Sequence, residues 1–547
     1  MTDLISRIRE AVIGEQHLMS TPFGERPLVY ADYTASGRSL EMIESVIRHR
    51  VMPYYANTHT ETSLTGAQTT AYREHARESI REAVGATRDD AVIFCGSGAT
   101  AAIHKLIDIL NLRLPADLDG QHRLSEHIPE SDRPVVLIGP YEHHSNELPW
   151  RETIARVVRI PLDARGQLDL RALEAELERH AGRSRVIGSF SAASNVTGIR
   201  TDVEAVTRLL KQHGALAFWD YAAAGPYVGI DMQGDGDHAK DAVFLSPHKF
   251  IGGPGTPGVL VVKKNLLNNR VPAVPGGGTV SYVTSASHRY VSNPERREEG
   301  GTPAIIESIR AGLVFRLQQA VGTDTIEARE QAFLKRALAD WQRIDNLEIL
   351  GPTDVPRLSI VSFRVRHGER HLHYGFVVAL LNDLFGIQAR GGCACAGPYG
   401  HTLLNIDDAT SQAIEAQVVA GEPLLRPGWT RLNFNYFIDE ATFHYLVRAV
   451  TLVAEHGWRL LPAYRYDRTT GTWRHHAGRA PLQSLADIDF SQSGEAAQGR
   501  NQRPLSDYLV AGEAILKDGA TTDDTETLAL SPEAEALRWF VRPQDVA

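Results

Sequence analysis

The chain has 547 residues, of which 43% are hydrophobic and 23% are charged, and its formal net charge is −10. This composition is that of a globular protein and excludes disorder as the main state. The acidic balance argues against a nucleic-acid partner and against a polybasic membrane anchor. The sequence has no long apolar run and no secretory signal at its start, and it has only three cysteines. We therefore expect a cytoplasmic protein without a disulfide framework.

The first part of the chain alternates short apolar runs with helical patterns. We expect an N-terminal arm over residues 1–30, followed by an amphipathic helix over 68–85. The next apolar runs lie at 91–95, 134–139, 185–190, 215–219, 242–245 and 258–262, with helical patterns at 99–110, 145–154, 169–180 and 202–213. Apolar strands that alternate with helices predict a mostly parallel sheet covered on both faces. The fold class is therefore α/β, with a large domain over residues 31–303.

The pattern changes after residue 303. Helices are predicted at 304–320, 326–341, 374–385 and 440–455, and strands at 358–365, 387–389 and 430–434. This mixture predicts a smaller α+β domain over residues 304–460. Residues 461–547 begin with several aromatic side chains and end in an acidic stretch around residues 523–526, and we interpret them as a C-terminal appendage.

Three polar elements follow predicted strands of the large domain. The strand at 91–95 runs into Gly96-Ser97-Gly98-Ala99-Thr100 and then a helix, and a helix N-terminus favours phosphate, although a turn without a ligand is the alternative. Asp220 ends another strand, at the edge where open sheets bind ligands, although it could simply cap a helix. Lys249 also follows a strand, where it could form a Schiff base or be a surface lysine. Together, a phosphate site, an acid and an amine match the requirements of pyridoxal phosphate.

Further motifs then occur in the order typical of one family. The chain resembles the class V aminotransferase family of pyridoxal-phosphate enzymes over residues 28–455, most closely its cysteine desulfurase and selenocysteine lyase branch. The resemblance implies the fold-type I architecture and a homodimer. The motifs that carry it are Tyr30–Ala35, Asn57-Thr58-His59, Glu142–Asn146, Ser194–Gly198, Ser246–Lys249, Glu299–Pro303 and Arg390–Ala396.

The resemblance assigns the residues expected to bind the cofactor. Lys249 matches the lysine that carries it as a Schiff base, and Asp220 matches the partner of the pyridinium nitrogen. His143 matches the histidine that stacks on the ring, and Asn195 the residue that bonds the ring hydroxyl. The residues expected at the phosphate are Gly98, Ala99, Thr100, Ser246, His248 and Thr302, the last of which reaches across to the other subunit.

The resemblance also implies a reaction on a small amino acid. Arg390 and Cys395 keep the family spacing Arg-x-Gly-x-x-Cys, so Cys395 takes the place of the nucleophile. Arg431 matches the arginine that holds the substrate carboxylate, a role suited to a planar guanidinium. Asn57 and His59 are also expected to bind substrate. The implied substrate is cysteine or selenocysteine, which becomes alanine, and the sulfur left on Cys395 implies an acceptor protein.

Three features differ from the family pattern and leave alternatives open. Ala223 stands where the family has glutamine, Cys393 stands where related enzymes have His or Ser, and the stretch between Cys395 and Arg431 is long. A C–S β-lyase, an aminotransferase, a decarboxylase or an epimerase with the same cofactor is the main alternative. A non-catalytic cofactor binder or sulfur-relay scaffold is the second. We expect no metal site, because no second ligand pair accompanies the two cysteines at zinc spacing.

Overall fold

A computed structural model describes residues 2–58, 60–236, 238–478, 481–491, 499–520 and 526–546. The chain divides into two compact units. The first comprises Met1–Ile13, Thr34–Arg329 and Asp354–Leu358. The second comprises Gly14–Tyr33, Glu330–Thr353 and Ser359–Ala547.

The core of the first unit is a seven-stranded sheet. Its strands follow the order β4 (Asp90–Cys95), β10 (Gly258–Lys263), β9 (Ala242–Leu245), β8 (Leu216–Asp220), β7 (Val186–Ser191), β5 (Val135–Ile138) and β6 (Arg156–Arg159). The strands β5 to β9 are parallel to one another, and β10 is antiparallel to both of its neighbours, β9 and β4. The predicted α/β class is therefore confirmed. The strand β6 was not predicted, because its ends are arginines and it lies half-buried at the sheet edge.

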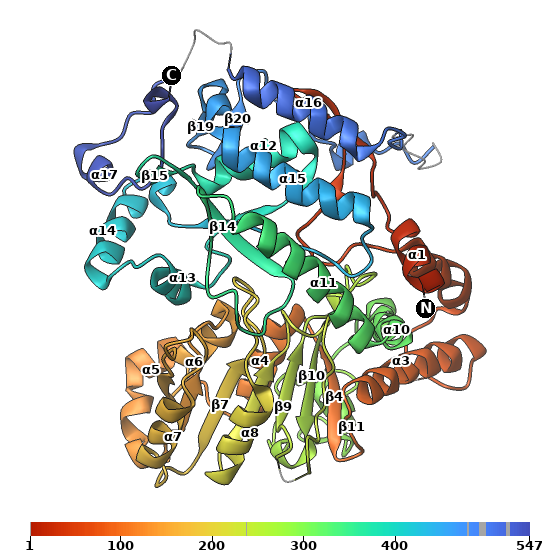
Figure 1. The fold of residues 1–547 in the computed structure, drawn as a ribbon. Coiled ribbons are helices and arrows are strands. Elements are labelled where there is room, and N and C mark those ends of the chain that lie inside the picture. The colour runs from red at the N-terminus through yellow and green to blue at the C-terminus, as the bar shows by residue number, and fades with distance from the viewer. Residues whose placement is uncertain are drawn as a thin grey trace. The chain divides into compact units, whose positions relative to one another are not determined.

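Helices cover the faces of this sheet. Figure 1 shows α7 (Leu170–Arg179) and α8 (Val203–Gln212) on one face of it. The long helices α3 (Leu64–Ala83) and α10 (Ile305–Val321) pack closely, since a Cβ on Gly312 would lie 2.4 Å from the Ala76 Cα. Because α10 packs on α3, the first unit extends beyond residue 303, where we expected the large domain to end. The other elements of this unit are α1 (Thr2–Glu10), α2 (Glu41–Val46), α4 (Gly98–Ile109), α5 (Ala116–His122), α6 (Leu148–Arg151), β11 (Val280–Val283), β12 (His288–Tyr290) and α9 (Pro294–Glu298).

The second unit is built on an antiparallel sheet. Its strands follow the order β13 (Leu347–Ile349), β14 (Ile360–His367), β18 (Trp429–Asn433) and β17 (Arg390–Gly392), with β15 (Arg370–His371) paired to β14. The strand β3 (Val29–Tyr30) pairs with β16 (Ile387–Gln388), so part of the expected N-terminal arm belongs to this unit. The hairpin β1 (Leu18–Thr21) and β2 (Gly24–Pro27) precedes it. The helices are α12 (Tyr374–Phe385), α13 (Gly397–Leu403), α14 (Asp408–Val419) and α15 (Glu440–His456), and α11 (Thr323–Trp341) runs from the first unit into the second.

The C-terminal segment also packs into the second unit. It contains β19 (Tyr464–Asp467), β20 (Thr472–His475), α16 (Leu505–Asp518) and α17 (Pro532–Ala536). The buried His373 accepts a hydrogen bond from Trp473 Nε1 at 3.0 Å, and its ring stacks on Trp539 at 5.3 Å. These contacts join residues expected to be an appendage to the helix α12. Of the predicted acidic stretch 523–526, only Glu526 lies within the described residues.

The described parts of the chain contain no helix with both the length and the apolar character needed to span a membrane.

Candidate active site

The predicted phosphate site lies where β4 turns into α4. Gly98 has a φ of 57°, and a Cβ at this position would come within 3.0 Å of Ser246 Oγ and His248 Cε1. The Ala99 N–H donates to Ser246 Oγ at 2.9 Å. Glycine is needed here both for the backbone conformation and for the close approach. The first turn of α4 therefore faces the segment that follows β9.

Hydrogen bonds connect this turn to His143. Thr100 Oγ1 and Ser145 Oγ are 2.6 Å apart, and Ser145 Oγ lies 3.0 Å from His143 Nδ1. The Ser145 N–H also donates to His143 Nδ1 at 3.1 Å. The structure thus brings Thr100 and His143 together through Ser145, a residue to which no role was assigned from the sequence.

The neighbouring Glu142 fixes the loop that carries His143. It is buried, and its carboxylate accepts hydrogen bonds from Ser191 N at 2.8 Å, Ser191 Oγ at 2.6 Å and Asn146 Nδ2 at 2.7 Å. Burial raises the pKa of Glu142 to about 7, although these hydrogen bonds favour the ionised form. The loop is therefore attached to the end of β7 by a buried acid.

Asp220 and Lys249 lie at the carboxyl edge of the same sheet. Asp220 is the last residue of β8, is buried, and accepts a hydrogen bond from the Ala222 N–H at 2.8 Å. Burial raises the pKa of Asp220, and the charge of Lys249 opposes that shift. Burial and the charge of Lys249 lower the pKa of His248 to about 4, which leaves its imidazole neutral near pH 7. Asn195 is buried on the loop after β7, the strand next to β8.

This set of donors has a definite chemical character. It combines backbone N–H groups, hydroxyls and a neutral imidazole with a buried carboxylate and an amine at the same edge of the sheet. A buried carboxylate needs a cation as its partner. The residues therefore suit a ligand that carries a phosphate, a protonated ring nitrogen and an aldehyde.

Two expected site residues of the first unit are not gathered into this arrangement. Asn57 is exposed, and its Oδ1 accepts a hydrogen bond from the Thr58 N–H at 2.8 Å. Thr302 is exposed on the loop that leads into α10. His59 lies outside the described residues.

A buried ion cluster fixes the start of the loop that carries Thr302. Glu299 accepts hydrogen bonds from Arg73 Nη2 at 2.7 Å, from Arg77 Nη1 at 2.9 Å and from the Phe94 N–H at 2.7 Å. Burial opposes ionisation, but Arg77 and Arg73 outweigh it and hold the pKa of Glu299 at about 2. The strand β4 lies at the edge of the sheet, so the Phe94 N–H group has no neighbouring strand to bond. The Glu299 carboxylate accepts its hydrogen bond instead. Glu299 was predicted only as part of the motif Glu299–Pro303, and this role was not predicted.

The variant Glu299→Gln should lower the free energy of unfolding by about 3–5 kcal/mol, because two buried arginines lose their carboxylate. Equilibrium denaturation of the purified variant measures this change. Glu74→Gln is the matched control, since Glu74 bonds the same Arg77 at 3.0 Å but is 52% exposed. An exposed partner contributes little, so Glu74→Gln should change stability by less than about 1 kcal/mol. Equal effects of the two substitutions would contradict the assigned role of Glu299.

The two expected substrate arginines lie together in the second unit. Arg390 of β17 and Arg431 of β18 are direct cross-strand partners. Asp32 binds both, with Oδ2 2.9 Å from Arg390 Nε and Oδ1 2.9 Å from Arg431 Nη2. Directly opposed like charges destabilise a sheet, so Asp32 compensates for the arrangement. Asp32 belongs to the motif Tyr30–Ala35, but its role could not be predicted from the motif, although two arginines at a binding site require an anion.

The two neighbouring cysteines lie on a strained turn. Cys393 and Cys395 are exposed, and the Ala396 N–H donates to the Cys393 carbonyl at 3.2 Å. The turn puts Ala394 at a φ of 52° and Cys395 at 55°. Positive φ at non-glycine residues costs about 1–3 kcal/mol each, and such strain is typical of functional sites. No group of three or more His, Cys, Asp or Glu suitable for a metal ion occurs among the residues that the structure describes.

The third cysteine, Cys95, lies buried at the end of β4. Burial raises the pKa of the Cys95 thiol to about 12. Because the thiolate is the reactive form, Cys95 is inert near pH 7.

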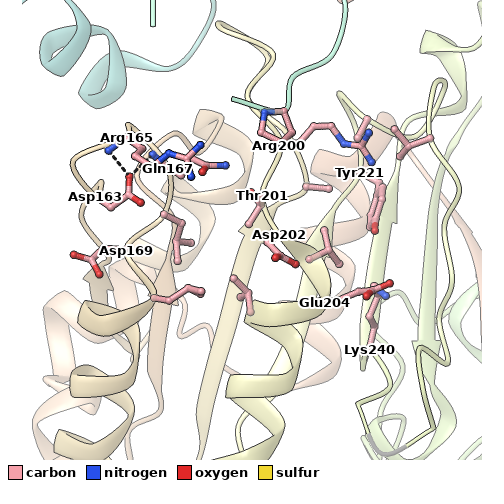
Figure 2. Close-up of a pocket in the computed structure, with 18 of the residues that line it drawn as sticks. Asp163, Arg165, Gln167, Asp169, Arg200, Thr201, Asp202, Glu204, Tyr221 and Lys240 are labelled. Atoms are coloured by element: carbon pink, nitrogen blue, oxygen red, sulfur yellow. Dashed lines mark hydrogen bonds between the residues drawn. The ribbon is translucent and has the colours of Figure 1, made fainter. Parts of the chain in front are cut away.

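A separate pocket of about 1060 Å³ lies beside the loops that follow β6, β7 and β8 (Figure 2). It contains none of the expected site residues. Its acids stabilise the local fold: Asp163 accepts a hydrogen bond from the Arg165 N–H, Asp169 caps α7 and Asp202 caps α8. These carboxylates are therefore explained by turn and helix capping.

Comparisons with known proteins place the chain in a family. The profile of the Aminotransferase class-V family matches residues 29–411. A probable cysteine desulfurase from Streptomyces coelicolor is 29% identical over 376 residues, which cover 68% of this chain and 84% of that protein. One from Staphylococcus epidermidis is 28% identical over 393 residues, which cover 71% of this chain and 88% of that protein. The chain belongs to the class V aminotransferase family.

Solved structures share the fold. A cysteine desulfurase from Thermococcus onnurineus has a TM-score of 0.64 at 22% identity, and the match covers 78% of this chain and 95% of that one. A cysteine desulfurase from Escherichia coli has a TM-score of 0.61 at 22% identity, and the match covers 78% and 94% of the two chains. The expected fold-type I architecture is confirmed.

Proposed function

We propose that the protein is a pyridoxal-phosphate-dependent cysteine desulfurase, which converts L-cysteine to L-alanine and retains the sulfur on Cys395. The observation that carries the proposal is the placement of a buried acid, Asp220, and the amine of Lys249 at the same sheet edge, where Ser246 contacts the first turn of α4. Family membership and the names of the relatives support it. The exposed Cys395, at the family spacing from Arg390, supports sulfur transfer in particular.

The residues of the first unit fit the cofactor. Ser246, His248 and the N-terminal turn of α4 would hold its phosphate, with Thr302 of the second subunit. Asp220 would bind its ring nitrogen, Asn195 its hydroxyl and Lys249 its aldehyde carbon. His143 would lie against the ring. When bound, the cofactor supplies an electron sink for the Cα–H bond of the amino acid.

Each side chain of the proposed site has a separate role in the reaction. Arg431 binds the substrate carboxylate and orients the amino acid. Lys249 Nζ removes the Cα proton of the amino acid. His143, beside the cofactor ring, serves as a second proton-transfer group. Cys395 Sγ forms a bond to the substrate sulfur while the Cβ–S bond of the substrate breaks. The electron pair of the Cβ–S bond passes to Cβ, which is then protonated. Cysteine and the Cys395 thiol thus yield alanine and the Cys395 persulfide, so atoms and electrons balance.

Identification of the products tests this proposal. The purified protein, supplied with pyridoxal phosphate, is incubated with L-cysteine and then alkylated, and products and peptides are analysed by mass spectrometry. We expect alanine, and one additional sulfur atom on the peptide that contains Cys395. Pyruvate with free sulfide would instead identify a C–S β-lyase. An amino-group transfer to a keto acid would identify an aminotransferase.

A homodimer is part of the proposal. The first unit exposes large apolar side chains, among them Met52 at 50%, Leu64 at 69% and Tyr282 at 72%, and such side chains suit a subunit interface. If Thr302 binds the partner's phosphate, cofactor affinity should fall as the protein is diluted below the dimer dissociation constant. Sedimentation analysis combined with cofactor titration measures this. A monomer with undiminished cofactor affinity would contradict the shared site.

The exposed thiol of Cys395 supports two further parts of the proposal, the cellular location of the enzyme and its sulfur-acceptor protein. Persulfide chemistry needs Cys395 reduced, so we propose a cytoplasmic enzyme. Because Cys395 is exposed, its persulfide is accessible to the thiol of an acceptor protein.

A further inference from the structure

The aromatic ring of Tyr374 packs against the backbone at the base of the cysteine turn, which we define as residues 393–396. A Cβ on Gly391 of β17 would lie 2.8 Å from Tyr374 Cδ2, and a Cβ on Gly428 would lie 2.6 Å from Tyr374 Cε1. These distances leave no space between the ring and the two backbone segments. The strand β17 ends at Gly392, directly before the turn, and Gly428 directly precedes β18. Tyr374 therefore packs where the turn joins the sheet.

Tyr374 is a neutral packing residue. Burial raises the pKa of Tyr374, and the phenol of Tyr466 and the thiol of Cys393 raise it further. The hydroxyl therefore keeps its proton near pH 7. The ring that contacts the two glycines is also the ring on which a charge at the first residue of the turn acts.

A tryptophan of the C-terminal segment stacks on this ring. The centroids of Trp539 and Tyr374 are 6.0 Å apart, and the two planes differ by 13°. Trp539 Nε1 donates a hydrogen bond to the Leu425 carbonyl at 3.1 Å. The backbone around Trp539 pairs with β15: the His371 N–H donates to the Trp539 carbonyl at 3.3 Å, and the Val541 N–H donates to the His371 carbonyl at 2.9 Å. The indole is therefore fixed through both its side chain and its backbone.

The cysteine turn depends on its surroundings because its backbone is strained. Ala394 and Cys395 both have positive φ, at 52° and 55°. The hydrogen bond from the Ala396 N–H to the Cys393 carbonyl closes the turn at 3.2 Å. Non-glycine residues keep such a conformation only where the surrounding structure determines it. The packing of Tyr374 at the base of the turn is one such determinant.

We propose that the C-terminal segment positions Cys395 for sulfur transfer, through the stack of Trp539 on Tyr374. The two aromatic side chains are positioning residues that act through the cysteine turn. The match to the family profile ends at residue 411, so Trp539 belongs to a part of the chain beyond that match. The inference rests on the proposed function in one respect, which is that Cys395 accepts the sulfur.

The variant Trp539→Leu tests the inference by two measurements on the holoenzyme. Trp539 is only partly buried, so its replacement should leave the second unit folded. Hydrogen–deuterium exchange in the peptide that contains the cysteine turn should become at least about tenfold faster, because the turn opens more often. The kcat for alanine formation from L-cysteine should fall at least about tenfold, since a displacement of about 1 Å at a reacting group costs up to about 100-fold.

Substrate binding should not change in this variant. The cysteine concentration that gives half of the change in cofactor absorbance should stay within about twofold of the wild type, because Arg431 is unaltered. A lower kcat at unchanged binding is the result expected when the thiol is misplaced. General damage to the unit would weaken binding as well.

Two control variants separate the stack from general packing. Tyr374→Phe keeps the ring, so both exchange and kcat should stay within about twofold of the wild type. Phe376→Leu removes another buried ring of α12, one that packs on Tyr464 at 5.2 Å and on Trp473 at 5.8 Å. It should lower stability, as large-to-small core substitutions do, but it should change neither exchange in the turn nor kcat.

Each outcome decides the inference. Unchanged exchange and unchanged kcat in Trp539→Leu overturn it and leave the desulfurase proposal intact. Equal effects of Trp539→Leu and Phe376→Leu also overturn it. If Trp539→Leu does not fold, Tyr374→Leu, which leaves the C-terminal segment unaltered, decides by the same measurements. If the wild type forms no alanine from L-cysteine but exchange in the turn responds as expected, the desulfurase proposal fails and the support of the turn by Trp539 stands.

Discussion

Lys249→Ala is expected to abolish alanine formation from L-cysteine, with a loss of at least about 1000-fold. Two functions disappear together in this variant, because Lys249 is both the amine for covalent attachment of the cofactor and the proposed base at Cα. The charge of Lys249 also favours the ionised form of the buried Asp220. Removal of the amine should therefore raise the pKa of Asp220 further in the cofactor-free protein.

Absorbance and product analysis together measure this effect. The wild type, supplied with pyridoxal phosphate, should be yellow, and borohydride should attach the cofactor to Lys249. The variant should retain no covalent label at this position. Lys264→Ala is the matched control, because Lys264 belongs to the same unit and its ammonium group donates to the Arg88 carbonyl at 2.5 Å. A Lys249→Ala variant with normal colour and normal alanine formation would refute the proposed function.

The large sheet was predictable because its strands are apolar along nearly their whole length. Fully buried parallel strands leave this signal, and the predicted run 242–245 coincides with β9. The strand β17 left no such signal, since Arg390-Gly391-Gly392 contains two glycines and a charge. Its strand conformation comes from pairing with β18, which is a long-range interaction. Local sequence patterns do not contain that information.

The residues of the site were predictable to a similar extent. Motif spacing identified Asp220 and Lys249, which the structure places at one sheet edge. The buried ions Asp32, Glu142 and Glu299 were not assigned roles, because a carboxylate in sequence does not reveal which arginine or backbone N–H it meets. Their partners come from distant parts of the chain, as with Asp32 and Arg431. The fold must be known before such pairs can be recognised.

The sequence also did not predict that residues 461–547 belong to the second unit. Residues 461–547 resemble an appendage in composition, yet Trp473 and Trp539 pack on His373 in the interior of that unit. Burial lowers the pKa of His373 to about 3, so the ring is neutral at physiological pH. A neutral imidazole is suited to stacking and to accepting the indole hydrogen bond. The segment is therefore part of the framework that carries β17 and β18.

Cys395→Ala is expected to lower alanine formation from L-cysteine at least about 100-fold, because the thiolate that accepts sulfur is removed. Cys393→Ala should retain more than about half of the activity. The two positions form a matched pair, since both side chains are exposed on the same turn. Alanine already occupies position 394 at a φ of 52°, so alanine at 395 should keep the conformation of the turn.

Cofactor absorbance separates binding from sulfur transfer in the Cys395→Ala variant. Addition of L-cysteine should still change the spectrum, because Lys249, Asp220 and Arg431 are intact, while alanine should not accumulate. If Cys393→Ala is the inactive variant instead, Cys393 is the sulfur acceptor and the family spacing is misleading here. If both variants remain active and release pyruvate, no thiol of the turn takes part. The reaction is then β-elimination, in which sulfide leaves without passing to the protein.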